Sequence, residues 1–377
     1  MGEYLAVSAP EGGRSFDEVK NLLRLQSSSP PGNDLCIGAC YESLLSLMAG
    51  DEQVDRFFLK IYNDRPSLTP SHTVNLLFRA IQHIQLNIKG DRTYLDFETP
   101  EEWRPVLVDI VESENRAVLT DLMLTKDTIT TKFQRYAGPK AIISSYWNGN
   151  AVNVADFGCG ANVGLSGLEL NNPFQEITDE TPDQLVIRET RMPMNIEIGL
   201  AVDKENPEDN EVQRWSNACS YYPKEFKELG ENGKLEPKLR GSQNIAFLQA
   251  DLLSTKISHM LPVADFDAVI LSTILYQCTS EERELMLKVA MRAAKPTGLV
   301  IVQDFAVKNP GNSRELIFNG AWGGGEFGYR TFVLQNKPDT DVLEIFQWSD
   351  GRCRTVKPGE DFDILLQVDK LDRINSI

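Results

Sequence analysis

The amino-acid sequence predicts an α/β protein in which a helical N-terminal region precedes a doubly wound, mostly parallel sheet. Up to about residue 147, apolar residues recur at three- to four-residue intervals, a pattern that is typical of helices. From residue 152 onward, short runs rich in Val, Ile and Leu alternate with helical stretches, which is typical of parallel strands covered on both faces. We therefore predict two domains, residues 1–147 and residues 148–377.

The helical region begins after a short leading helix and a breaker cluster of Ser, Pro, Gly and Asn at residues 27–33. Residues 40–48, 72–86, 100–124 and 128–147 have the apolar periodicity of four helices. Pro70 suits the first turn of the second of these, because its missing N–H has no partner there in any helix. No strand pattern interrupts this region, so we predict that it is entirely α-helical.

The strands of the second region are expected at residues 152–157, 196–202, 245–248, 266–271 and 299–302, with a helix at 280–294 before the last of them. Residues 330–334 and 342–348 flank a turn of Asn, Lys, Pro and Asp. This arrangement predicts that the parallel sheet ends in an antiparallel hairpin. The polar segment 171–195 is expected to be an inserted loop or hairpin.

Composition and charge exclude several kinds of partner. The formal net charge is −17, and no Lys/Arg cluster is present to displace counterions from a polyanion, so we expect neither nucleic acid nor an anionic membrane as a partner. The six cysteines show no CxxC spacing, and no group of His, Cys, Asp and Glu has the spacing of metal ligands, so we predict no metal. The first residues show neither a basic stretch nor an apolar stretch of a secretion signal, and we expect a cytoplasmic protein.

The most informative motif is VADFGCGANVG at residues 154–164. It predicts a strand that ends in Asp156, a loop that holds Gly158 and Gly160, and a helix that begins near Asn162. Glycines let a backbone approach a ligand closely, and small molecules bind at the carboxyl ends of strands in open α/β sheets. The alternative is a glycine turn with a capping aspartate and no ligand.

Two classes of ligand compete for this loop. Dinucleotides require G-x-G-x-x-G, but here the third glycine, Gly164, comes one place late, and the acid before the first glycine is not part of that pattern. An acid suits a ligand without phosphates that carries an ammonium group and a sulfonium, such as S-adenosylmethionine. A nicotinamide or nucleotide-sugar enzyme is therefore the weaker alternative.

The D-x-G-x-G form resembles the first motif of the class I S-adenosylmethionine-dependent methyltransferases, which have a Rossmann-like fold. It departs from that motif at Asn162, where a further glycine is common. The resemblance implies that Asp156, Gly158, Gly160 and Asn162 line the cofactor site.

Later strand ends match the same superfamily in the expected order. The resemblance implies that Asp203, after the second strand, receives the ribose hydroxyls, and that Asp251, after the third, accepts the adenine amino group. Leu252 and Ser272 are then expected to line the site beside them. Arg135 precedes the first strand and is a candidate for the methionine carboxylate.

A second resemblance covers most of the chain. The sequence NLLF at residues 75–78, IGL at 198–200, RW at 214–215 and the stretch 275–283 are similar to those of a bacterial family of unknown function. That family joins a helical half to a methyltransferase-like half. The resemblance supports the two-domain organisation, with the helical half as a lid or substrate domain.

These features predict a methyltransferase that acts on a small molecule or a short peptide by direct in-line transfer. Such a reaction depends on holding donor and acceptor at attack distance and has no obligatory catalytic side chain. Tyr276, Asp304 and His72 are the candidates for a catalytic role, and the glycine-rich segment 320–329 is a candidate lid loop. The alternative function is a catalytically inactive cofactor-binding or regulatory module. The oligomeric state is left open, with a homodimer as one option.

Overall fold

The computed structural model describes residues 15–129, 132–229, 244–318, 328–336, 341–365 and 367. Contacts divide the chain into two compact units. The sheet unit includes Thr131–Pro207 and Lys238–Ile377, and the helical unit includes Glu11–Thr130 and Glu208–Pro237. This division differs from a single boundary at residue 147, because the chain leaves the helical unit earlier and returns to it after the second long strand. The expected lid loop, residues 320–329, lies almost entirely outside the described residues.

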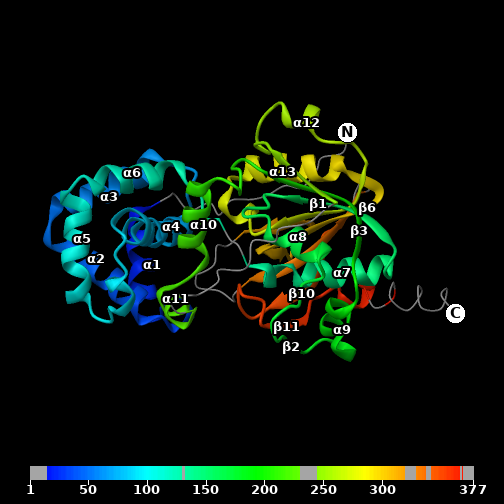
Figure 1. The fold of residues 1–377 in the computed structure, drawn as a ribbon, viewed down its shortest axis with the longest axis horizontal. Coiled ribbons are helices and arrows are strands. Elements are labelled where there is room, and N and C mark those ends of the chain that lie inside the picture. The colour runs from blue at the N-terminus through cyan, green and yellow to red at the C-terminus, as the bar shows by residue number, and fades with distance from the viewer. Residues whose placement is uncertain are drawn as a thin grey trace. The chain divides into compact units, whose positions relative to one another are not determined.

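A nine-stranded sheet forms the centre of the sheet unit (Figure 1). Five of its strands are parallel: β1 (Ala151–Phe157), β3 (Asn195–Asp203), β4 (Ile245–Gln249), β5 (Phe266–Ser272) and β6 (Ala294–Phe305). They are arranged in the order β4-β3-β1-β5-β6. This order is the one that defines the Rossmann-like, doubly wound sheet, and the direction of strand addition reverses between β1 and β5. The predicted fold class is confirmed, and the reversal marks where such a sheet binds ligands.

The far end of the sheet is antiparallel. β9 (Tyr329–Gln335) pairs with β6 and with β10 (Leu343–Trp348), which confirms the predicted hairpin. β11 (Thr355–Pro358) pairs antiparallel with β10, and the two-residue β2 (Thr178–Asp179) adds to β11 as a parallel edge strand. β7 (Val307–Asn309) and β8 (Asn312–Ile317) form a separate antiparallel pair.

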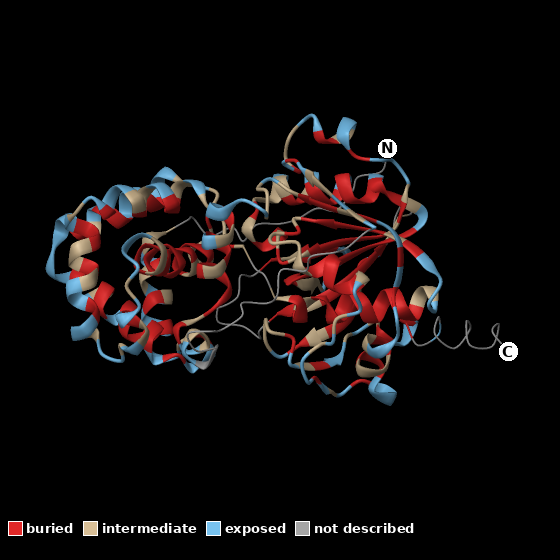
Figure 2. Ribbon diagram, in the orientation of Figure 1, coloured by how far each residue is buried: buried red, intermediate tan, exposed pale blue. Residues whose placement is uncertain are grey.

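Helices cover both faces of the sheet. α13 (Ser280–Ala293) lies on one face, and α7 (Ala137–Trp147), α8 (Val163–Glu169) and α9 (Leu185–Arg191) lie on the other, with the short α12 (Ile257–Met260) beyond the sheet on the side of α13 (Figure 1). The central strands β1, β5 and β6 are mostly buried on both faces, whereas the edge strand β4 is not, and Figure 2 shows the buried centre of the sheet.

The segment 171–195 is not the loop or hairpin that its polar composition suggested. It contains the edge strand β2 and the helix α9, which packs against α7. Leu185 and Val186 of α9 are completely buried, and Ile187 beside them packs against the same core, so a short apolar run anchors this helix within a polar segment.

The helical unit contains α1 (Phe16–Ser28), α2 (Leu35–Gly50), α3 (Glu52–Asp64), α4 (Pro70–His83), α5 (Pro100–Glu112) and α6 (Asn115–Thr125). A π-helical turn, Ile84–Lys89, extends α4. Residues 100–124, expected as one helix, form two, because Ser113 has an extended backbone (φ −101°, ψ −171°) and its hydroxyl accepts a hydrogen bond from the Asn115 N–H at 3.1 Å.

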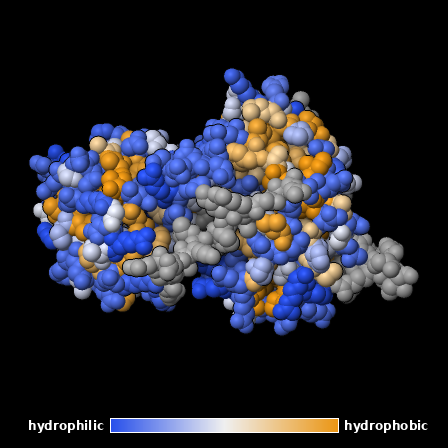
Figure 3. Space-filling view, viewed as in Figure 1, coloured by the Kyte–Doolittle hydropathy of each residue, from blue (hydrophilic) through white to orange (hydrophobic). Residues whose placement is uncertain are grey.

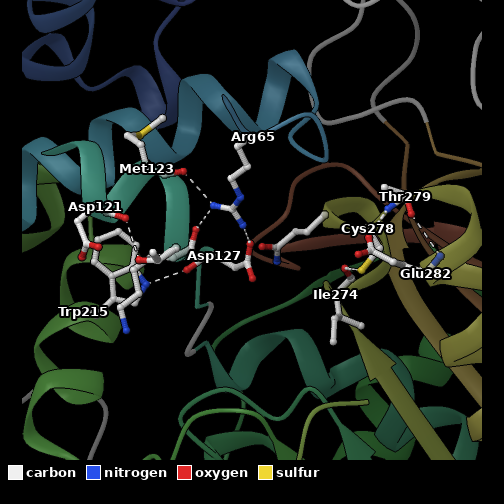
Figure 4. Close-up of polar contacts among 12 residues, drawn as sticks. Arg65, Asp121, Met123, Asp127, Trp215, Ile274, Cys278, Thr279 and Glu282 are labelled. Carbon is white, nitrogen blue, oxygen red and sulfur yellow. Dashed lines mark hydrogen bonds and ion pairs between the residues drawn. The ribbon is translucent and has the colours of Figure 1, made fainter. Parts of the chain in front are cut away.

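Two further helices of the helical unit come from between β3 and β4. These are α10 (Asn210–Ser220) and α11 (Pro223–Leu229), which sequence analysis did not assign to this unit. The indole N–H of Trp215 on α10 donates to the Asp127 carbonyl at 2.8 Å, and the Arg65 guanidinium donates to the Met123 carbonyl at 3.0 Å (Figure 4). Arg79 of α4 donates to the Tyr221 carbonyl, just past the end of α10, at 2.8 Å. The contacts of Trp215 and of the Tyr221 carbonyl therefore join α10 to the helical unit.

The surface in view is mostly hydrophilic, with separate hydrophobic patches (Figure 3). Among the described residues, no helix has the length and apolar character that crossing a membrane requires. All six cysteines fall within the described ranges, where each side chain is buried and forms no disulfide bond.

Candidate functional site

The glycine loop between β1 and α8 has a backbone that only certain residues adopt. Gly158 has φ +76° and Gly160 has φ +56°, and Asn162, which precedes α8, has φ +54°. A Cβ on Gly158 would lie 2.2 Å from the Cδ1 atom of Ile274, in the loop after β5. Glycine is therefore required at 158 both by backbone conformation and by the approach of Ile274 across the point where strand order reverses.

The backbone N–H groups of this loop already have partners inside the protein. Gly158 and Cys159 donate to the Val202 carbonyl at 2.8 and 3.2 Å, and Gly160 donates to Asp203 Oδ2 at 2.8 Å. In phosphate-binding loops, such N–H groups point at the ligand instead. The geometry of this loop therefore disfavours a dinucleotide pyrophosphate.

The loop presents hydrogen-bond acceptors. Asp203, at the end of β3, is partly exposed, and its two oxygens accept from the Gly160 and Glu205 N–H groups. Burial raises the pKa of Asp203, and these two hydrogen bonds oppose that shift. The side-chain oxygen of Asn162 is buried and has no hydrogen-bond partner among the described residues. An acceptor without a donor is costly to bury, so this position suits a ligand that carries N–H or O–H groups.

The loop after β4 lies next to Asp203. The Ala250 N–H donates to the Asp203 carbonyl at 2.8 Å, which brings Asp251 to the same edge of the sheet. Asp251 is exposed, and its Oδ1 accepts from the Leu253 N–H at 2.9 Å, while the neighbouring Leu252 is buried. The structure therefore brings Asp203, Asp251 and the glycine loop together at one edge.

Asp156 lies inside the protein. It is completely buried at the end of β1, and the Tyr136 hydroxyl donates to its Oδ2 at 2.8 Å. Burial raises the pKa of Asp156 to about 7, although the Tyr136 hydrogen bond opposes the shift. A side chain in this position supports the loop from the protein interior. The motif had instead suggested that Asp156 contacts the ligand directly.

Tyr136 reaches Asp156 because α8 has glycines on the facing side. A Cβ on Gly164 would lie 1.9 Å from Tyr136 Cζ, and a Cβ on Gly167 would lie 2.4 Å from Phe133 Cε2. Sequence analysis missed this packing. The available signal was a pair of glycines three residues apart in a predicted helix, which would place them on one face.

The loop after β5 is held in an unusual conformation. Thr273, which follows Ser272, has φ +59°, a rare value for a β-branched residue. Its N–H donates to the Gln303 carbonyl at 2.8 Å, and its hydroxyl is 2.9 Å from the Tyr329 hydroxyl. Ser272 itself is half-buried at the carboxyl end of the strand. Strain of this kind persists where the surrounding structure over-determines it, often at functional sites.

Asp304 and Tyr276 stabilise this loop. Asp304 is completely buried and accepts backbone hydrogen bonds from Leu275 (2.7 Å), Tyr276 (3.3 Å) and Phe305 (2.7 Å). Burial raises the pKa of Asp304 to about 6. The Tyr276 ring packs edge-on against Phe305, with centroids 5.1 Å apart. Both catalytic candidates therefore have structural contacts of their own.

The same loop leads directly into α13. The Cys278 thiol donates to the Ile274 carbonyl at 3.4 Å, and Thr279 and Glu282 form a capping box at the start of the helix (Figure 4). The Thr279 N–H donates to Glu282 Oε2 at 2.7 Å. Hydrogen bonds thus hold both ends of the short segment from Ile274, which covers Gly158, to Thr279.

The contacts of Arg135 are with residues outside the glycine loop. Arg135 Nε donates to the Gly351 carbonyl at 2.8 Å, and its guanidinium carbon is 5.6 Å from the centre of the Tyr329 ring. His72 belongs to the helical unit, where it is buried in the first turn of α4. Its use as a base stays a prediction. No group of three or more potential His, Cys, Asp and Glu ligands that could hold a metal occurs among the described residues.

Comparison with known proteins gives structural likenesses only. No protein-family model matches the chain, so the resemblance to a bacterial family is not confirmed, and no curated protein matches it. Solved structures do match, at low similarity. A putative methyltransferase in complex with the Trm112 methyltransferase activator of Haloferax volcanii is 14% identical, with a TM-score of 0.25, over 46% of this chain and 53% of that one.

The YcgJ protein of Bacillus subtilis is 12% identical, with a TM-score of 0.27, over 47% of this chain and 53% of that one. The [4+2]-cyclase SpnF is 18% identical, with a TM-score of 0.24, over 49% and 50% of the two chains. The matched part spans about half the length of each of these chains.

Proposed function

We propose that the sheet unit binds S-adenosylmethionine at the carboxyl ends of β1, β3 and β4, and that the protein is a methyltransferase. The observation that carries this proposal is the donor and acceptor inventory of the glycine loop. Its first three N–H groups are used internally, while Asp203 and Asn162 offer acceptors. A ligand with hydroxyl and ammonium donors and no phosphate complements this set.

The residues present fit this cofactor in three places. Asp203 would accept the ribose hydroxyls, the Asn162 side-chain oxygen would accept from the methionine ammonium, and exposed Asp251 would accept from the adenine amino group. Gly158 and Gly160 keep the loop free of side chains above β1. Ser272 would border the site from the end of β5. When bound, the cofactor supplies a methyl group activated by its sulfonium.

The protein contributes positioning in this proposal. In-line methyl transfer is accelerated by holding the two reactants at attack distance and by excluding water. Asp304 and Arg283 hold the loop after β5, since both make hydrogen bonds to Leu275, the former to its N–H and the latter to its carbonyl at 2.8 Å. The lid role of the helical unit and any acid or base role of Tyr276, Asp304 and His72 remain predictions.

The acceptor is proposed to be a small molecule or a short peptide. A net charge of −17 repels polyanions, and the sequence has no basic stripe to offset the repulsion. A mobility-shift experiment at low salt, where electrostatic binding is strongest, is expected to show no complex with RNA or DNA. Micromolar binding to either would contradict the proposed acceptor class.

Titration calorimetry tests the cofactor assignment. S-adenosylhomocysteine is expected to bind, whereas NADH is not, because the N–H groups of Gly158, Cys159 and Gly160 are already hydrogen-bonded within the protein. Binding of NADH in place of S-adenosylhomocysteine would overturn the proposal. A methyl-release assay across candidate acceptors then separates an enzyme from the alternative function, a cofactor-binding module without turnover.

A further inference from the structure

Arg135 has a donor with no acceptor. Its Nε is bonded to the Gly351 carbonyl, but its Nη1 is buried and has no hydrogen-bond partner among the described residues. A guanidinium presents its N–H groups as a planar fork, which matches the two oxygens of a carboxylate. No carboxylate of the described residues forms an ion pair with Arg135. The vacant part of the fork therefore suits an external anion.

The contacts of Arg135 place it on the β6–β9 side of the strand-order reversal. Its backbone carbonyl accepts a hydrogen bond from the Gln303 side-chain amide, and Gln303 belongs to β6. Its guanidinium faces the ring of Tyr329 on β9 and the turn at Gly351 between β10 and β11. The groups suited to the cofactor, by contrast, follow β1, β3 and β4. Arg135 therefore lies on the other side of the strand-order reversal from these groups.

A chain of aromatic rings begins at Tyr329, the ring that Arg135 faces. Phe305 lies between Tyr329 and Tyr276, with ring centroids 4.7 and 5.1 Å away. A Cβ on Gly351 would lie 3.2 Å from Phe305 Cζ and 3.7 Å from Arg135 Nη2, so the ring and the guanidinium border the same residue. Together they place one cationic fork beside buried, planar aromatic rings.

We propose that this cluster binds the methyl acceptor, and that the acceptor is a small carboxylic acid with a planar, apolar body. Arg135 would hold the carboxylate while Phe305 and its neighbouring rings contact the planar part. The inference rests on the proposed function for its reaction, but the binding of an acid at Arg135 is measurable without it. Arg135 acts here in binding, and no proton is assigned to it.

The carboxylate at Arg135 has a second source, the methionine moiety of the cofactor, and the experiment separates the two. Benzoate and neutral benzamide serve as probes, and S-adenosylhomocysteine is titrated separately. The variants are Arg135→Gln, Arg135→Lys, which keeps the charge but loses the fork, and Arg354→Gln. Arg354 is an exposed arginine in the turn that contains Gly351, and it pairs with Asp350. Its replacement removes the same net charge and therefore serves as a control.

Wild type and Arg354→Gln are expected to bind benzoate at least about tenfold more tightly than benzamide, and Arg135→Gln to lose that difference, with Arg135→Lys between them. S-adenosylhomocysteine affinity should stay within about twofold in every variant. A large loss of S-adenosylhomocysteine affinity in Arg135→Gln, with benzoate unaffected, would assign Arg135 to the cofactor and overturn the proposal. Equal binding of the two probes, or binding of neither, would also overturn it. Failure of wild type to bind S-adenosylhomocysteine would refute the proposed function instead.

Discussion

Asp203 has two tasks in the structure, and they can be separated by substitution. Its carboxylate accepts the Gly160 N–H and is proposed to accept the ribose hydroxyls as well. Asp203→Ala removes both interactions and is expected to weaken S-adenosylhomocysteine binding by about 1–3 kcal/mol, since it leaves hydrogen-bond donors without partners. Titration calorimetry measures this loss.

Asp203→Asn provides the matched control, because its amide oxygen can still accept from Gly160. The asparagine variant should keep the thermal stability of the wild type more closely than the alanine variant does. If Asp203→Ala binds with unchanged affinity, the ribose assignment is wrong.

Asp156 is expected to make stability depend on pH. Its folded pKa of about 7 lies above the usual value of 3.8, so the folded state holds a proton that the unfolded state releases between those values. Stability conferred by this group is thus present at low pH and is lost as pH rises toward 7, by at most about 4 kcal/mol. Asp156→Asn cannot titrate and should lack this loss.

Urea unfolding of both proteins between about pH 4 and 8 measures the effect. The free energy of unfolding of the wild type should fall relative to that of Asp156→Asn across this window. A constant difference between the two would show that the carboxyl is not protonated in the folded protein. Asp304, with a folded pKa of about 6 from burial, is present in both proteins and cancels in the comparison.

At the scale of elements, α8 and the segment before α7 fit together through glycines. Gly164→Ala would place a methyl group 1.9 Å from Tyr136 Cζ, so the ring must move and its hydrogen bond to Asp156 must break or bend. Overpacking of this kind typically destabilises a protein by about 1–3 kcal/mol. Thermal unfolding is expected to show this loss.

Gly50→Ala is the control for this substitution. A Cβ on Gly50, at the end of α2, would have nothing within 4 Å, so its replacement should be neutral or slightly stabilising. Removing the ring in the double variant Gly164→Ala/Tyr136→Ala should make the two effects strongly non-additive. Simple additivity would contradict the packing described here.

Some secondary-structure elements could be predicted from the sequence and others could not. The central strands β5 and β6 were predictable because strands buried on both faces consist largely of apolar residues. The helix α9 was not predictable, because its buried Leu185 and Val186 occur within a polar segment. The break between α5 and α6 depends on the Ser113 side chain competing with the helix for hydrogen bonds, a balance that periodicity does not record.

At the scale of the whole molecule, the chain crosses between its two units more than once, and α10 belongs to the helical unit. Arg79 is buried and donates to the Ala218 and Tyr221 carbonyls at 3.3 and 2.8 Å. Arg79→Met keeps the aliphatic bulk but leaves those carbonyls without this partner. Hydrogen exchange is expected to quicken in residues 210–222, while β1 and β5 keep their protection.

Arg56→Met is the matched control, because Arg56 is exposed and pairs only with neighbouring Glu52 in the described structure. It should leave exchange in residues 210–222 unchanged. If Arg79→Met instead exposes the central strands and spares α10, the assignment of α10 to the helical unit is wrong.

The sequence by itself determined the class of fold, the order of the main strands along the chain and the position of the glycine loop. Each of these follows from local patterns, namely apolar runs, turn residues and glycines at a strand end. It also placed Asp203 and Asp251 at strand ends that parallel strands must bring to one edge.

Only the tertiary structure decided what the candidate residues face. Asp156 turns to Tyr136, Asp304 to the backbone of the loop after β5, and Arg135 to β9 and Gly351. These partners are distant in sequence, and side-chain direction depends on packing between elements rather than on the pattern within one. For the same reason, the sequence could not predict the strained conformation of Thr273, whose hydrogen bonds to Gln303 and Tyr329 follow β5.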